Sequence, residues 1–300
     1  MNSFSFNRFG KMLRWVLSVN FKRMLGFTIA GALGWFLAEM IIIKMIGYND
    51  PHPHSMVWSV SQFGVVAFLL MLVIFISTVV YSVNSKRKRE AFLMLPATNL
   101  EKFLSLVFYT TIVLTLCLCL ALVIGDSLRM GWMWINEPSV GTISVKFEQT
   151  GETWHWWSSA IPQMVDNLTP NVLQANDKYD YSTWYITMQL LFMLAFTLWI
   201  HSLFTLGGVY LRKYSFVLTG LFFILCMVLL VKFVHAYDIN MFTSHWDNGT
   251  YVSEEVGTLA YVLTVVLPLF SILHYWASFH IFKSFQLITN KWTNYDILKR

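Results

Sequence analysis

Among the ionisable residues inside the long apolar runs of the sequence, we single out three as candidates to carry protons or contact a polar substrate. They are Glu39 in run 25–46, His201 in run 183–210 and His274 in run 256–282. An ionisable group is costly in hydrocarbon, so each is a candidate residue of a translocation path. For Glu39 we favour structural pairing with another polar group. The histidines fall in different runs, and the pattern indicates no proton relay between them.

Other patterns with catalytic or ligand-binding meaning are weak. The sequence has no G-x-x-x-x-G-K-[ST] phosphate-binding loop, so we expect any ATP hydrolysis to occur on another chain. His52 and His54 lack the further ligands of a metal site. Cys117, Cys119 and Cys226 lie in apolar runs and are best explained as packing residues. We therefore predict no catalytic residue, metal or cofactor on this chain.

Six apolar runs must position these residues. Apolar residues make up 56% of the chain and charged residues only 12%, which excludes an ordinary soluble globular protein. A membrane-spanning helix needs about 20 apolar residues. The six runs are Leu25 to Ile46, Met56 to Val83, Phe103 to Ile124, Thr183 to Tyr210, Phe216 to Val234, and Val256 to Phe282. The expected fold is an all-α polytopic membrane protein with six transmembrane helices.

Basic residues gather on one side of these runs. They occupy the first 23 residues, the connection 84–102, the connection at Arg212 and Lys213, and the tail 283–300. Because short basic loops stay cytoplasmic, we expect both termini inside. The opposite side holds most acidic residues and the large, tryptophan-rich loop 125–182. This asymmetry and attraction to anionic lipid explain the positive net charge without a nucleic-acid partner.

Residues 1–23 show an amphipathic pattern. Lys11 and Arg14 fall on a polar face, and Phe9, Leu13 and Val16 on an apolar one. This favours a helix lying on the cytoplasmic membrane surface over a merely basic tail. The transmembrane domain then covers residues 24–300.

The connection 84–102 joins a basic cluster, Lys86 to Arg89, to the apolar patch Phe92 to Leu95. Pro96 ends one helix, and Thr98 with Glu101 has the capping-box spacing that begins another. The pattern predicts a helix, a corner and a second helix with an exposed apolar tip. Such a tip either binds a soluble partner or dips into the lipid interface.

This layout resembles the permease subunits of type-2 ABC exporters. The resemblance rests on the N-terminal amphipathic helix, the six spans with both ends inside, and the connection with its basic cluster, Glu90 and Leu95-Pro96. By that resemblance, residues 1–23 are the elbow helix, and the coupling element that seats in an ATPase subunit comprises Arg89, Glu90, Phe92, Leu93, Leu95 and Pro96.

The resemblance also implies a function. Two permeases, identical or different, and two ATPase subunits holding ATP-Mg would export an unidentified substrate across the bacterial inner membrane. The alternatives are a secondary carrier and a scaffold or immunity-type membrane protein. A glutamate-type membrane protease fits poorly, because Glu254-Glu255 lacks the arginine expected shortly after it.

The topology is testable by labelling single cysteines in a background without Cys117, Cys119 and Cys226. Cysteines at Ser139 and Asn248 should react with an impermeant thiol reagent in intact cells, because both positions fall on the predicted outer side. One at Ser85 should not react, and its labelling would contradict the six-span topology.

Overall fold

The computed structural model describes residues 4–46, 53–83, 86–136, 145–146, 153–154, 158–168, 182–211, 214–247 and 250–284. Six helices among them are long and apolar enough to cross a membrane: Phe6–Met45, Met56–Ser77, Asn99–Asn136, Thr183–Tyr210, Ser215–Ala236 and Thr258–Lys283. The chain is therefore an all-α polytopic membrane protein, as its composition predicts. Its orientation in the membrane stays a prediction.

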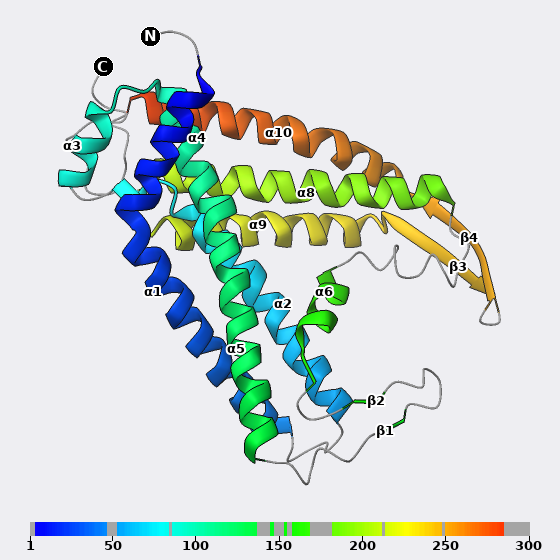
Figure 1. Ribbon diagram of the computed structural model, residues 1–300. Helices are drawn as coiled ribbons and strands as arrows, with labels where there is room; N and C mark the ends of the chain where they lie inside the picture. Colours follow the sequence, from blue (N-terminus) through cyan, green and yellow to red (C-terminus); the bar gives the residue numbers. More distant parts are fainter. Residues whose placement is uncertain are drawn as a thin grey trace. The chain divides into compact units, whose positions relative to one another are not determined.

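The elements follow one another as labelled in Figure 1. They are α1 (Phe6–Ile46), α2 (Pro53–Ser77), the 3-10 turn η1 (Tyr81–Val83), α3 (Lys86–Met94), α4 (Asn99–Phe108), the π-helical stretch η2 (Tyr109–Val113), α5 (Leu114–Asn136), β1 (Val145–Lys146), β2 (Thr153–Trp154), α6 (Ile161–Leu168), α8 (Thr183–Tyr210), α9 (Ser215–Ala236), β3 (Phe242–Asp247), β4 (Thr250–Val256) and α10 (Thr258–Lys283). They form two compact units: unit 1 is Met1–Leu17, Val73–Thr111 and Pro170–Arg300, and unit 2 is Ser18–Leu72 and Ile112–Thr169.

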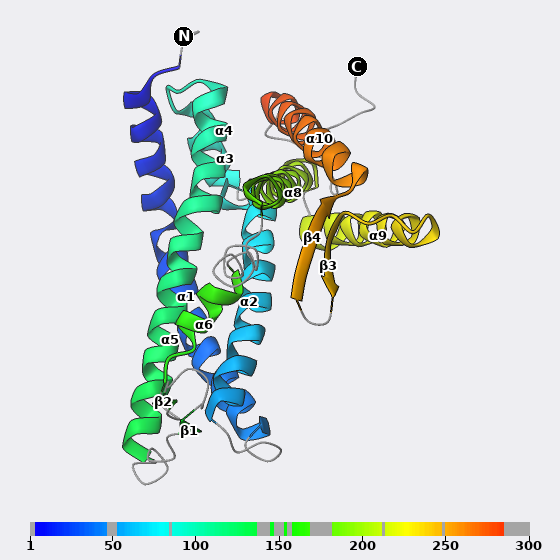
Figure 2. The ribbon, with the colours of Figure 1, turned by 90° about the vertical axis from the view of Figure 1, so that its right-hand side faces the viewer.

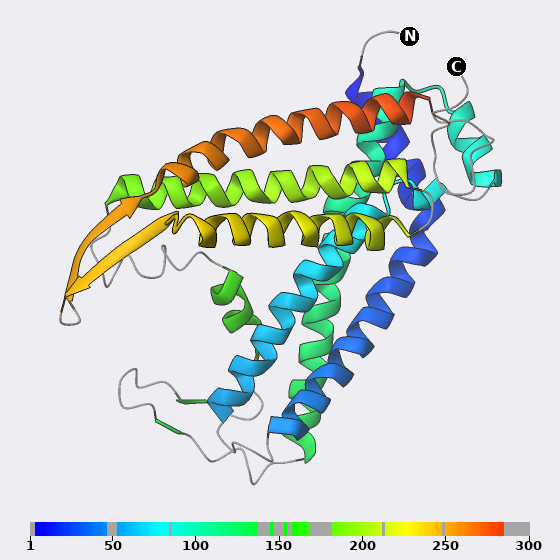
Figure 3. The same ribbon diagram turned by 180° about the vertical axis from the view of Figure 1, so that it is seen from behind.

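In unit 1, α8 lies between α9 and α10, and the three helices run side by side (Figures 1 and 3). Small residues allow this close packing. A Cβ on Gly207 would collide with the Thr219 side chain of α9, and a Cβ on Gly208 would lie 2.6 Å from the carbonyl oxygen of Ser77. The Gly207-Gly208 pair therefore lets α8 approach α9 and the end of α2.

The strands β3 and β4 form an antiparallel hairpin that joins α9 to α10 (Figure 3). Phe242 pairs with Val256, and the register shifts between His245 and Trp246. Phe242 also packs edge-on against Tyr185 near the start of α8. This contact fixes the base of the hairpin on the helices of unit 1.

In unit 2, the later part of α1, most of α2 and α5 pack together, with α6 beside α5 and α2 (Figure 2). Their shared core lies around Trp35 and consists of Trp35, Ile43, Met56, Val57, Val60, Met133, Ala160 and Met164. Met164 brings α6 into this core, and Asn167 of α6 donates a hydrogen bond of 3.0 Å to the Ser61 hydroxyl.

Two predicted boundaries differ from the structure. The predicted division at residue 23 falls inside α1, which continues without a break from Phe6 to Ile46. The third span continues through α5 to Asn136, although residues from 125 onward were expected in a loop. Close packing explains the longer helix, because a Cβ on Gly125 would lie 2.7 Å from the Ala32 carbonyl oxygen and 2.8 Å from Trp35.

The helix packing gives a stability prediction. Gly208→Ala should destabilise the protein by about 1–3 kcal/mol, the usual cost of overpacking, because the obstacle at Ser77 is backbone. Gly220→Ala on α9 is the matched control: its Cβ meets nothing within 4 Å, so the melting temperature should stay or rise slightly. Equal melting temperatures for the two variants in detergent would contradict the close approach.

Candidate functional site

The predicted corner between α3 and α4 is present in unit 1. α3 ends at Met94, Pro96 follows, and α4 begins after Thr98. The Glu101 amide donates to the Thr98 hydroxyl at 3.2 Å, and the Thr98 amide donates to Glu101 Oε2 at 2.8 Å. The capping box is confirmed, and its two reciprocal bonds satisfy amides at the start of α4 that no helical carbonyl reaches.

Glu101 also binds the beginning of the chain. Arg8 Nη2 donates to Glu101 Oε1 at 2.9 Å, and the Ser5 amide donates to the same oxygen at 2.8 Å. The Glu101 side chain is fully buried. The N-terminal turn of α1 is thereby fixed to the first turn of α4. We predicted only the cap for Glu101, and no local pattern in the sequence points to Arg8 as its partner.

Phe92 lies inside the protein, which corrects its predicted exposure at the tip. Its side chain is 0% exposed and packs between Trp15 of α1 and Phe282 of α10, with ring centroids 5.9 Å and 6.3 Å away. The Lys102 ammonium lies 5.8 Å from the ring centroid. An aromatic ring gains more from this packing than from water, so the largest apolar residue of α3 faces inward.

The remaining residues of the predicted coupling element divide between two faces. Arg89 is buried, whereas Glu90, Leu93 and Leu95 are half-buried and Pro96 is exposed. The most exposed apolar side chain of the corner is Met94, at 87%. Lys102 Nζ donates to the carbonyl oxygen of Leu93 at 2.9 Å. This bond ties the last turn of α3 to α4 on the other side of Pro96.

The N-terminal segment keeps the predicted division into faces. Lys11 and Arg14 are exposed, Phe9 and Leu13 are half-buried, and Val16 is fully buried. The apolar face packs partly on the protein itself, since the Phe9 ring lies edge-on to Phe108 of α4. Contact of this segment with the membrane surface stays a prediction.

The structure places His201 and His274 at one interface, where α8 packs against α10, which the sequence did not indicate. His201 of α8 hydrogen-bonds through Nε2 to Thr111 Oγ1 of η2 at 2.8 Å and through Nδ1 to the Tyr275 hydroxyl of α10. His274 Nδ1 lies 3.1 Å from the Ser202 hydroxyl. The signal in the sequence is the pair of neighbours, His201-Ser202 and His274-Tyr275, which face each other once α8 and α10 pack.

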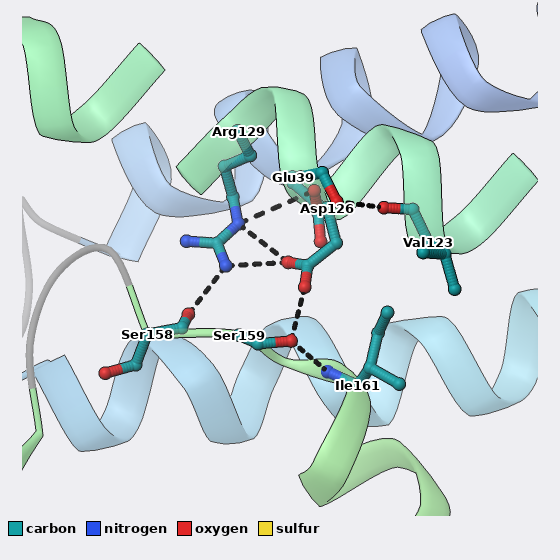
Figure 4. Close-up of polar contacts among 8 residues, drawn as sticks. Glu39, Val123, Asp126, Arg129, Ser158, Ser159 and Ile161 are labelled. Atoms are coloured by element: carbon teal, nitrogen blue, oxygen red, sulfur yellow. Dashed lines mark hydrogen bonds and ion pairs between the residues drawn. The ribbon is translucent and has the colours of Figure 1, made fainter. Parts of the chain in front are cut away.

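In unit 2, Glu39 belongs to a buried charged cluster with two residues that were predicted to lie in an outer loop. Arg129 of α5 lies 3.5 Å from Glu39 Oε2 and 2.7 Å from Asp126 Oδ1 (Figure 4). All three side chains are at most 2% exposed. The favoured interpretation of Glu39 as a residue in structural pairing agrees with this geometry. The placement of Asp126 and Arg129 in a loop was wrong, because α5 extends past them.

The groups assembled here can bind protons and form hydrogen bonds. Among the described residues, no group of three or more His, Cys, Asp or Glu side chains is arranged to hold a metal ion.

Comparisons with family models, with curated proteins and with solved structures found no significant match to this chain.

The role of Glu101 can be tested by Glu101→Ala. We expect the free energy of unfolding to fall by at least about 1.5–3 kcal/mol, the worth of one hydrogen bond to a charged group, because the Arg8 side chain and the Ser5 and Thr98 amides all lose their acceptor. The control Glu90→Ala removes a half-buried glutamate from α3 and should cost less. Equal losses of melting temperature would show that Glu101 does not fix the corner.

Proposed function

We propose that this chain is the membrane-spanning permease subunit of an ATP-driven ABC exporter in the bacterial inner membrane. The observation that carries the proposal is the corner between α3 and α4, which presents an exposed face while it packs against α1 and α10 and is hydrogen-bonded to α4. A separate ATPase subunit would hold ATP-Mg, and two permease chains would complete the transporter. The six apolar helices provide the membrane domain that this function requires.

The exposed face of α3 is suited to a protein groove. Arg87, Ala91 and Met94 are exposed and lie three or four residues apart, so they share one side of the helix. Burying a methionine side chain is worth about 1.5–3 kcal/mol, which equals roughly tenfold to hundredfold in affinity. In this proposal Met94 is the apolar anchor for the ATPase, and Arg87 adds a charge beside it.

Phe92 has a different role in the same helix. Its ring contacts α1 and α10 in unit 1, so it joins the docking helix to two membrane helices. A displacement of α3 by the ATPase would therefore pass through Phe92, Trp15 and Phe282. Glu101 and Arg8 hold the adjoining turn, which lets the corner move without unwinding at Pro96.

A secondary carrier is the second candidate. The observation that favours it is the cluster of Glu39, Asp126 and Arg129, since buried ionisable groups in membrane helices often serve ion-coupled transport. Such a carrier would need no ATPase. A scaffold or immunity-type protein would need only the exposed face of α3.

The test compares Met94→Asp with Met94→Leu in tagged protein purified from membranes of the native host. The wild-type chain should retain a partner that contains a phosphate-binding loop and hydrolyses ATP. Met94→Leu should keep this partner, and Met94→Asp should lose it at an unchanged melting temperature, because Met94 is 87% exposed. Phe92→Asp should instead lower the melting temperature, since Phe92 is buried.

Two results would contradict the proposal. If the wild-type chain retains no ATP-hydrolysing partner, the chain is not an exporter subunit, and the carrier or scaffold function takes its place. If Met94→Asp keeps the partner and its ATPase activity, the exposed face of α3 is not the docking surface.

A further inference from the structure

The buried cluster in unit 2 contains two carboxyl groups and a single guanidinium group (Figure 4). Glu39 comes from α1, and Asp126 and Arg129 come from successive turns of α5. Glu39 and Arg129 are 0% exposed and Asp126 is 1% exposed. The other charged side chains of this unit that the structure describes, Lys22, Arg23, Lys44 and Asp166, are exposed or half-buried.

Both oxygens of the Asp126 carboxylate accept hydrogen bonds. Its Oδ1 accepts from Arg129 Nη2 at 2.7 Å and from Arg129 Nε at 3.2 Å. Its Oδ2 accepts a short hydrogen bond from the Ser159 hydroxyl. Arg129 Nη2 also donates to the carbonyl oxygen of Ser158 at 2.6 Å, so the cluster fixes the segment that leads into α6.

Glu39 forms an ion pair with Arg129 but accepts no hydrogen bond from the residues that the structure describes. Its Oε2 lies 3.5 Å from Arg129 Nε, an ion-pair distance without hydrogen-bond geometry. Neither oxygen of Glu39 has a hydrogen-bond partner among the described residues, and the same holds for the indole nitrogen of Trp35, one helical turn earlier. An ionised carboxylate that is fully buried and accepts no hydrogen bond is unfavourable.

The net charge of the cluster also argues against two ionised carboxylates. Two ionised carboxylates and one guanidinium leave one uncompensated negative charge in a buried site within the membrane helices. Two carboxyl groups that share such a site do not both ionise, and their titration belongs to the pair rather than to either residue. One proton on the pair makes the cluster neutral.

We propose that Glu39 and Asp126 together bind one proton at neutral pH, which makes this cluster a proton-binding site in the membrane domain. The ligand is a proton, and Arg129 compensates the single remaining carboxylate. The site is hydrogen-bonded through Ser158 and Ser159 to the segment that leads into α6. The inference is independent of the proposed ATPase partner.

Infrared difference spectroscopy of the full-length protein in lipid tests the site. The wild-type protein should show the carbonyl band of a protonated carboxyl group at neutral pH. Glu39→Gln should remove this band, because the remaining Asp126 pairs with Arg129 as an ionised carboxylate. Asp126→Asn should remove it too, with Glu39 then ionised. The control Glu255→Gln changes an exposed glutamate and should leave the band in place.

Thermal stability gives an independent readout. The folded cluster holds a proton that the unfolded chain has released at neutral pH, so stability falls as the pH rises, by about tenfold in the unfolding equilibrium per pH unit for one proton. Glu39→Gln should abolish this slope, whereas Glu255→Gln should keep it. The double variant Glu39→Gln, Asp126→Asn should melt below either single variant, because it leaves the guanidinium uncompensated.

The proposal is overturned if Glu39→Gln removes the band of an ionised carboxylate and leaves the band of a protonated one unchanged. Should Glu39→Gln fail to fold, the same band is followed in the wild-type protein as the pH is raised. Reversible loss of the band as the pH rises supports the site. A wild-type spectrum that lacks the band at neutral pH refutes the site.

Discussion

Lipid hydrocarbon offers no hydrogen-bonding partners, and this constraint determines how the polar side chains inside this chain are arranged. In unit 1, His201 directs its two ring nitrogens to hydroxyl groups on η2 and α10, and His274 uses a hydroxyl of α8. In unit 2, Arg129 is placed between Asp126 and Glu39. His201, His274 and Arg129 each contact a polar group on a neighbouring helix, so helix packing and polar pairing depend on each other.

At the corner between α3 and α4, a side chain likewise supplies partners for polar groups that would otherwise have none. A helix that starts within a protein leaves amides without partners, and the capping box of Thr98 and Glu101 provides them. The second oxygen of Glu101 is then available to Arg8 and to the Ser5 amide. One carboxylate thereby begins α4 and holds the start of α1, although 93 residues separate Glu101 from Arg8.

The sequence predicted the features that depend on local patterns. Apolar runs located the six spans, with the bounds of α8 matching its run, and the spacing of Thr98 and Glu101 located the cap. Features that depend on distant residues were not predictable in this way. Phe92 was predicted as an exposed anchor, but Trp15 and Phe282 cover it in the structure. Asp126 was predicted in a loop, but α5 continues past it, and Gly125 allows α1 to pack closely there. The sequence shows only that Arg129 is charged. Its position opposite Glu39 depends on the packing of α1 against α5.

In the proposed function, the two faces of α3 have separate roles, one in binding the ATPase and one in transmitting force. Arg89 and Phe92, three residues apart, point into unit 1, while Arg87, Ala91 and Met94 point away from it. A partner that covers the outer face gains about 1.5–3 kcal/mol from one apolar anchor. The inner face is held by aromatic packing on two helices and by the bond from Lys102 to Leu93. Because several contacts act together on the inner side, we expect a push on Met94 to move α3 with its neighbours instead of detaching it from them.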